Sequence, residues 1–232
     1  MQVVSTSPLI KTYTLEEFWK LPEPRDGSKL ELIAGVLYMS PPPDFPHNFT
    51  TSDLNMLFSE HLLKTQDKGR LFIPRAALWT GPATYVEPDL FYVSERTFKR
   101  LDWRRPDTAD LVVEVISPST AIYDRNTKAD TYAALSVREL WLVDPDNGTV
   151  EVRYLKRSRK GKKRGYDVIR VFKYDERVES GVLPTFSPPK IGGAGYQPAP
   201  PILIVSGRRS RHERLLWSLI FVTPSLANRN DE

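Results

Sequence analysis

Two strongly apolar segments, residues 86–93 and 111–116, constrain the fold most, because each is typical of a strand covered on both faces. Each segment nevertheless carries an acid. Asp89 follows Pro88, and Glu114 lies between two valines. Carboxylates are rarely fully buried without a partner. The sequence therefore predicts a sheet with helices on both faces and, within it, acidic groups that require a cation.

Three helices are predicted outside these segments. Residues 14–17, TLEE, match a capping box and indicate a short helix over 15–20. The spacing of apolar residues predicts a second helix from His47 to about Gln66, ended by Gly69. A turn at 117–119 leads into a third helix, expected over 122–135.

Strand patterns alternate with these helices, which predicts an α/β fold with a mixed sheet flanked by helices. The expected strands are 29–32 and 36–39, forming a hairpin, then 71–79, 86–93, 111–116, 140–143, and a second hairpin of 150–155 and 166–172. After Pro188 the chain is rich in Gly and Pro. We expect one domain over 1–188 and a linker with a tail over 189–232.

Composition excludes several classes of protein. The chain has no cysteine, which excludes a disulfide framework and thiolate zinc sites. No apolar run approaches the roughly 20 residues of a spanning helix. The first ten residues lack the basic and apolar regions of a signal peptide. We therefore expect a cytoplasmic protein that does not contact membranes.

A basic cluster interrupts the second hairpin. Residues 153–164 hold eight Lys and Arg residues and no acid. Such a cluster either contacts nucleic-acid phosphates or forms a solvated hairpin tip. Its members are Arg153, Lys156, Arg157, Arg159, Lys160, Lys162, Lys163 and Arg164.

The embedded acids are candidates for a metal site. Neighbouring strands lie about 4.8 Å apart, so Asp89 and Glu114 can converge on one cation if they share a face of the sheet. Two carboxylates with open water positions suit Mg²⁺ or Mn²⁺. Glu31, in an earlier strand, is a third candidate acid. Alternatively, each acid is a salt-bridged or edge-exposed residue.

The helix after Glu114 offers a cation. Asp124, Lys128 and Tyr132 are spaced i, i+4, i+8 and so share one face. Lys128 can balance carboxylate charge and orient or deprotonate a water molecule. Alternatively, it forms a surface pair with Asp124. His47 either caps its helix or faces the acids.

Together these segments resemble the Uma2 family of endonucleases, within the PD-(D/E)XK nuclease superfamily. The resemblance covers roughly residues 12–186 and implies a restriction-endonuclease-like core with a divalent metal held by acids on adjacent strands. The matching segments are LELIAG, His47 after a proline-rich turn, VEPDL, VVEVISPST, DRNTK with Tyr132, and RELWLVDP.

The resemblance also implies roles for particular residues. Asp89 and Glu114 stand for the two motif acids and would bind the metal with the carbonyl oxygen of Val115. Glu31 matches an early acid of the family. The usual motif lysine falls at Ile116, an apolar residue. Lys128 is its substitute, and His47, Asp124 and Tyr132 would support the pocket.

The function expected from this resemblance is a Mg²⁺- or Mn²⁺-dependent endonuclease that acts on DNA. The resemblance also implies a homodimer. The apolar Ile116 favours an alternative, a catalytically decayed fold that binds DNA or protein. A two-carboxylate hydrolase acting on a glycoside is a third possibility.

Overall fold

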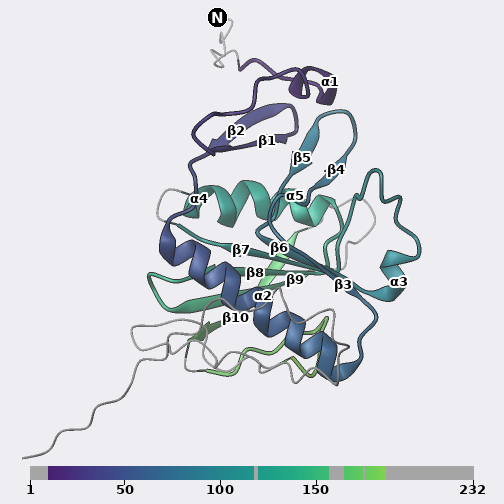
Figure 1. The fold of residues 1–232 in the computed structure, drawn as a ribbon, viewed down its shortest axis with the longest axis vertical. Helices are drawn as coiled ribbons and strands as arrows, with labels where there is room; N and C mark the ends of the chain where they lie inside the picture. Colours follow the sequence, from purple (N-terminus) through teal and green to yellow (C-terminus); the bar gives the residue numbers. More distant parts are fainter. Residues whose placement is uncertain (1–9, 118–119, 157–164, 175, 187–232) are drawn as a thin grey trace, which may run out of the picture. The chain divides into compact units, whose positions relative to one another are not determined.

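The large sheet contains six strands and carries most of the apolar core (Figure 1). The computed structural model describes residues 10–117, 120–156, 165–174 and 176–186. The strand order is β10-β9-β8-β7-β6-β3. The β7–β8 pair is parallel and the other pairs are antiparallel, which confirms the predicted mixed sheet. The strands are β3 (Arg70–Phe72), β6 (Leu90–Val93), β7 (Leu111–Val115), β8 (Glu139–Asp144), β9 (Thr149–Leu155) and β10 (Tyr166–Lys173).

A small antiparallel sheet has the order β2-β1-β5-β4. Its β1–β2 hairpin turns at Ala34 and Gly35, which have φ values of 49° and 82°. Two successive positive φ angles suit the twist of a tight hairpin, so the predicted turn is confirmed. The strands are β1 (Lys29–Ile33), β2 (Val36–Ser40), β4 (Leu78–Thr80) and β5 (Thr84–Val86).

Helices cover both faces of the large sheet (Figure 1). Leu54 and Phe58 of the long helix α2 pack into the cluster on one face. Ala129 and Tyr132 of α5 pack on the other face, together with residues of the small sheet. The helices are α1 (Leu15–Phe18), α2 (Phe45–Thr65), α3 (Glu95–Phe98), α4 (Ala121–Tyr123), the π-helical turn η1 (Asp124–Lys128) and α5 (Ala129–Ala134).

Two predicted strands are each split between the two sheets. The expected strand 71–79 is β3 and β4, and the expected strand 86–93 is β5 and β6. Pro74 and Pro88 lie in the two breaks, and proline cannot donate a hydrogen bond to a ladder. The prediction that Asp89 lies within a strand is therefore wrong. It lies in the crossing from the small sheet to the large one.

The end of α2 also differs from prediction. Gln66, with φ 54°, is the left-handed residue that ends the helix, rather than Gly69. Gly69 instead packs closely against Tyr92, because a Cβ atom at this position would overlap the Tyr92 ring unless the ring shifted. The third predicted helix is confirmed as the continuous run α4, η1 and α5, although its π-helical turn was not predicted.

No helix among the described residues is long and apolar enough to cross a membrane. The predicted linker and tail over 189–232 lie outside the described residues, so the division at 188 stays a prediction.

Candidate active site

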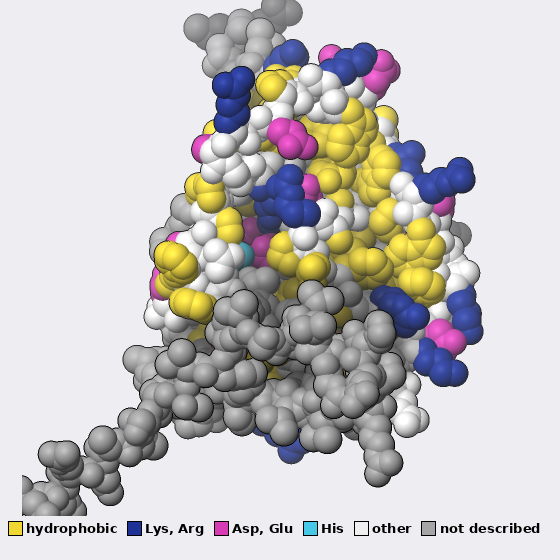
Figure 2. Space-filling model, in the orientation of Figure 1, with side chains coloured by type: hydrophobic (Ala, Val, Ile, Leu, Met, Phe, Trp, Pro, Cys, Tyr) yellow, Lys and Arg dark blue, Asp and Glu magenta, His cyan; other side chains and the backbone are white. Residues whose placement is uncertain are grey.

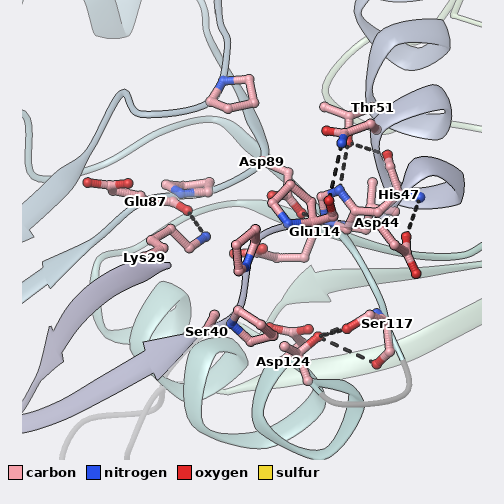
Figure 3. Close-up of a pocket in the computed structure, with 18 of the residues that line it drawn as sticks. Lys29, Ser40, Asp44, His47, Thr51, Glu87, Asp89, Glu114, Ser117 and Asp124 are labelled. Carbon is pink, nitrogen blue, oxygen red and sulfur yellow. Dashed lines mark hydrogen bonds and ion pairs between the residues drawn. The ribbon is translucent and has the colours of Figure 1, made fainter. Parts of the chain in front are cut away.

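Three of the predicted acids, Asp89, Glu114 and Asp124, line one pocket, where the two sheets meet the first turn of α2 (Figure 3). Glu31 does not line this pocket. The cavity has a volume of about 340 Å³. Asp89 and Glu114 lie between His47 on one side and Lys29 and Glu87 on the other in this view.

The register of the large sheet explains why Asp89 and Glu114 meet. Leu90 pairs with Val113 between β6 and β7, so one further step sets Asp89 opposite Glu114. Val113 and Val115 face α2, whereas Val112 faces α5. Because side chains alternate along a strand, Glu114 points towards α5 with Val112. Two segments distant in the sequence thus bring two carboxylates to the same edge of the sheet.

Asp89 is held as a carboxylate by two donors. Its Oδ2 accepts a hydrogen bond from the Val115 amide at 2.8 Å and lies 3.2 Å from His47 Nε2. Burial acts to raise the pKa of Asp89, but the His47 hydrogen bond and the charges of Lys29 and Lys128 outweigh it. The pKa is therefore held well below its usual range. Asp89 carries a full negative charge at neutral pH.

Glu114 is almost completely buried, with 1% of its surface exposed. Its Oε2 accepts a hydrogen bond from Lys128 Nζ at 3.0 Å, and its Oε1 accepts one from the Tyr132 hydroxyl. Burial, followed by the charges of Asp89 and Asp124, raises the pKa of Glu114 above its ordinary value, although Lys128 opposes the shift. Glu114 is therefore more easily protonated than Asp89.

Lys128 lies at the centre of three carboxylates. Its Nζ is 3.0 Å from Glu114 Oε2, 3.4 Å from Glu31 Oε2 and 3.4 Å from Asp124 Oδ1. Its side chain is 3% exposed, so the alternative of a surface pair is wrong. Burial lowers the pKa of Lys128, but Glu114 and Glu31 raise it well above its ordinary value. Lys128 is therefore a permanent cation, suited to orient a water molecule rather than to deprotonate one.

The local helix geometry places Asp124 and Lys128 in this cluster. Both belong to the π-helical turn η1, a geometry that occurs frequently at functional sites. Tyr132 follows one α-helical turn later in α5 and is fully buried. The predicted shared face of Asp124, Lys128 and Tyr132 is thus directed at Glu114.

Glu31 joins the small sheet to this cluster. It is fully buried in β1, and its Oε1 accepts a hydrogen bond from the Glu87 amide at 2.8 Å. Its Oε2 faces Lys128 and lies 3.4 Å from the Tyr123 hydroxyl oxygen. With both oxygens engaged by the protein, Glu31 holds Lys128 in place.

Among the charged residues that line the pocket, Lys29, Asp44, Arg75 and Glu87 were not predicted. The sequence could have identified Lys29, because it is two residues before Glu31 and so lies on the same face of the strand. The sequence contains no comparable pattern for Arg75, which lies in the connection between β3 and β4.

The structure describes the predicted basic cluster only at its N-terminal end. Arg153 has 14% of its side chain exposed and pairs with Glu151 at 2.5 Å, while its Nη1 donates to the Arg125 carbonyl. Lys156 is 65% exposed and pairs with Asp167. Lys156 is thus the more accessible of the two. The other six predicted residues, Arg157, Arg159, Lys160, Lys162, Lys163 and Arg164, lie outside the described residues.

The carboxylates of the pocket suit a hard metal cation that takes few of its ligands from the protein. Within the described ranges, no group of three or more His, Asp or Glu side chains is arranged to hold a metal ion. Two adjacent carboxylates, Asp89 and Glu114, nevertheless line an open cavity. Mg²⁺ characteristically takes one or two carboxylates and completes its shell with water and substrate phosphate oxygens. The residues present therefore fit Mg²⁺ or Mn²⁺ bound together with a substrate.

Comparison with known proteins gives the family and the fold. No curated protein matches the chain. A solved structure, described as a putative nuclease belonging to DUF820 from Anabaena variabilis, is 22% identical in sequence. The match covers 74% of this chain and 91% of that one, with a TM-score of 0.55. This likeness confirms the predicted nuclease-like α/β fold. The profile of the Uma2 family, described as putative restriction endonuclease, matches residues 15–187. The chain therefore belongs to the Uma2 family.

Proposed function

We propose that this protein is an endonuclease that hydrolyses DNA phosphodiester bonds with Mg²⁺ or Mn²⁺. The observation that carries the proposal is the convergence of Asp89 and Glu114 beside the buried ammonium of Lys128. A pair of acids with a neighbouring cation is what metal-assisted attack of water on a phosphate requires.

Each residue of the cluster has a role in this proposal. Asp89 and Glu114, with the carbonyl oxygen of Val115, would hold the ion, which supplies a Lewis acid at the scissile phosphate. Lys128 orients the attacking water and offsets the charge that develops on the phosphate. Four positioning residues support these groups. His47 holds Asp89, and Tyr132 holds Glu114. Asp124 and Glu31 hold Lys128.

The position of Lys128 supports its role as the substitute for the absent motif lysine. Ile116 is 3% exposed and packs in the apolar cluster with Val112 and Leu142. Lys128 instead reaches the same acid, Glu114, from the following helix. The cation is thus supplied by the next element of the chain.

A DNA substrate calls for further contacts. Lys156 and the rest of the basic cluster would bind backbone phosphates, a contribution that weakens as salt increases. A homodimer, in which paired sites cut both strands, is part of the same proposal.

The decisive experiment is cleavage of plasmid and linear DNA by the purified protein with Mg²⁺, with Mn²⁺ and with a chelator. Asp89→Asn is expected to abolish metal-dependent cleavage while DNA binding persists. Asp107→Asn makes the same chemical change at an exposed residue that does not line the pocket, and should retain activity. Undiminished cleavage by Asp89→Asn would refute the assignment.

One observation favours the second candidate, a decayed site that only binds DNA or protein. Both oxygens of Glu114 already accept hydrogen bonds from protein groups. Titration calorimetry with Mn²⁺ separates the two: a working site releases or absorbs heat that Asp89→Asn abolishes, whereas a decayed site gives no heat in either protein.

A further inference from the structure

A second charged region lines the pocket away from the metal-binding acids. Lys29, in β1, and Arg75, between β3 and β4, both line the cavity. Their side chains are 20% and 62% exposed, whereas that of Lys128 is 3% exposed. Figure 3 shows Lys29 on the opposite side of Asp89 from His47. Lys29 and Arg75 are therefore cations that a ligand entering the pocket can reach.

Glu87 holds both cations in place. Its backbone oxygen accepts a hydrogen bond from Lys29 Nζ at 2.8 Å. Its Oε2 lies 3.3 Å from Arg75 Nη1, while its Oε1 accepts a hydrogen bond from the Tyr85 hydroxyl. The Glu87 side chain is 6% exposed, and its backbone amide is fixed by Glu31. A rigid, buried residue thus sets the positions of two more accessible cations.

The charges divide the pocket into two regions. Around Lys128, the three carboxylates of Glu31, Glu114 and Asp124 exceed one ammonium, which attracts a metal cation. Around Glu87, the two cations Lys29 and Arg75 face the carboxylates of Glu87 and Glu31, the latter 3.9 Å from Lys29. The second region is therefore less negative than the first, and its cations are more exposed than its carboxylates. Figure 2 shows basic and acidic side chains grouped with a histidine near the middle of this face.

Arg75 is not arranged as an ordinary structural ion pair. Glu87 Oε2 is buried and, among the described residues, has no hydrogen-bond partner, so Arg75 lies close to it without hydrogen-bond geometry. Arg75 also has φ 76°, a conformation that non-glycine residues adopt rarely and that gathers at ligand-binding sites. The guanidinium keeps donors free to bind a planar pair of anionic oxygens.

From these contacts we infer that Lys29 and Arg75 form a phosphate-binding subsite, with Glu87 as its positioning residue. The ligand is a backbone phosphate of the nucleic-acid strand, next to the phosphate over Asp89 and Glu114. The assignment of the strand as substrate rests on the proposed function, but phosphate binding by these two residues does not require cleavage.

The test measures binding of a short fluorescein-labelled DNA duplex to the full chain in chelator, by anisotropy over a series of KCl concentrations. Lys29→Gln and Arg75→Gln are each expected to lower the magnitude of the salt slope, d log K/d log [salt], by about 1. The matched control is Lys64→Gln. Lys64 is exposed, pairs only at the surface with Glu60, and lies 17 residues along α2 from His47, or about 26 Å. The salt slope of Lys64→Gln should equal that of the wild type.

Glu87 is tested by a double-mutant cycle. If it acts through Arg75, Glu87→Gln weakens binding in the wild type but causes no further loss in Arg75→Gln. Equal losses in both backgrounds would overturn the positioning role. Lys29→Arg, which keeps the charge, should restore most of the salt slope that Lys29→Gln loses. Far-ultraviolet circular dichroism of each variant identifies any loss that comes from unfolding.

The outcomes separate this inference from the proposed function. Unchanged slopes in both variants, with cleavage by the wild type intact, overturn the subsite alone. Lowered slopes in a protein that never cleaves DNA support the subsite and remove the nuclease. A wild type that neither binds nor cleaves DNA overturns both.

Discussion

Lys128 Nζ lies 3.0 Å from Glu114 Oε2, and both side chains are almost completely buried, at 3% and 2% exposure. This pair joins the strand that carries Glu114, a proposed metal ligand, to the helix that follows it. Breaking it should be costly, because the carboxylates around Lys128 would lose their counter-charge.

The first prediction concerns removal of that charge. Lys128→Met should lower the free energy of unfolding by about 3–5 kcal/mol, the typical cost of leaving buried charge without its partner. Urea denaturation at pH 7 measures the loss. In a Glu114→Gln background the same change should cost less, because one of the three carboxylates is then neutral. An equal cost in both backgrounds would show that the two residues are not coupled.

The second prediction concerns the absent motif lysine. Ile116→Lys should not restore cleavage to Lys128→Met, and should itself destabilise the fold by several kcal/mol, because Ile116 packs among apolar side chains. Thermal unfolding and plasmid cleavage measure the two effects. Ile116→Val, which removes one methylene, is the control and should cost about 0.5–1.5 kcal/mol. A fully active, stable Ile116→Lys/Lys128→Met protein would contradict this account of the substitution.

The third prediction concerns metal binding. Mn²⁺ at a hundred times its Kd should raise the free energy of unfolding by about 2.7 kcal/mol, since a ligand that binds only the folded state stabilises it. Differential scanning fluorimetry with and without Mn²⁺ detects this as a shift in Tm. The shift should vanish in Asp89→Asn and persist in Asp107→Asn. Equal shifts in all three proteins would place the ion elsewhere.

The fourth prediction concerns acid stability, away from the pocket. Asp110 accepts a hydrogen bond from the Ser94 amide at 2.8 Å and pairs with Arg138 at 3.1 Å. Burial raises its pKa, but these partners outweigh burial and leave the pKa below its ordinary value. The resulting stability is present above the unfolded pKa of about 3.9 and is lost as the pH falls through the lower folded value.

Asp110→Asn should therefore cost about 1–3 kcal/mol at pH 7, because it removes hydrogen bonds to a charged group. Below about pH 4, the wild type should lose stability more steeply than the variant as the pH falls. Urea titrations from pH 7 to pH 2 measure both curves. Parallel curves would show that Asp110 does not contribute to acid unfolding.

Much of the fold was accessible from the sequence, because local patterns specify it. The apolar runs around Glu114 and the helical spacing from Asp124 to Tyr132 predicted both the strand and the face that meets it. Which sheet a strand joins is decided by distant partners. The segments containing Pro74 and Pro88 were therefore assigned to single strands although each crosses between sheets.

The residues of the candidate site also fall into those that the sequence identified and those that it did not. Its acids were identifiable because carboxylates within apolar runs are conspicuous. Lys29, Arg75 and Glu87 were not identified, since charged residues in hairpins and connections are common and only the folded arrangement brings them together. Similarly, nothing in the local sequence indicated that Gln66 rather than Gly69 would take the left-handed conformation.

The position of Glu31 has a kinetic consequence. The Tyr123 hydroxyl approaches Glu31 across 92 residues of sequence, and Lys128 lies beyond it in the same helical run. Contacts of such long range form only after a large loop of the chain has closed. The chain loses conformational entropy in that closure before the contacts contribute to stability. The charged centre should consequently be completed late as the chain folds. A partly folded copy that already holds its large sheet would lack the proposed hydrolytic activity until the N-terminal hairpin docks.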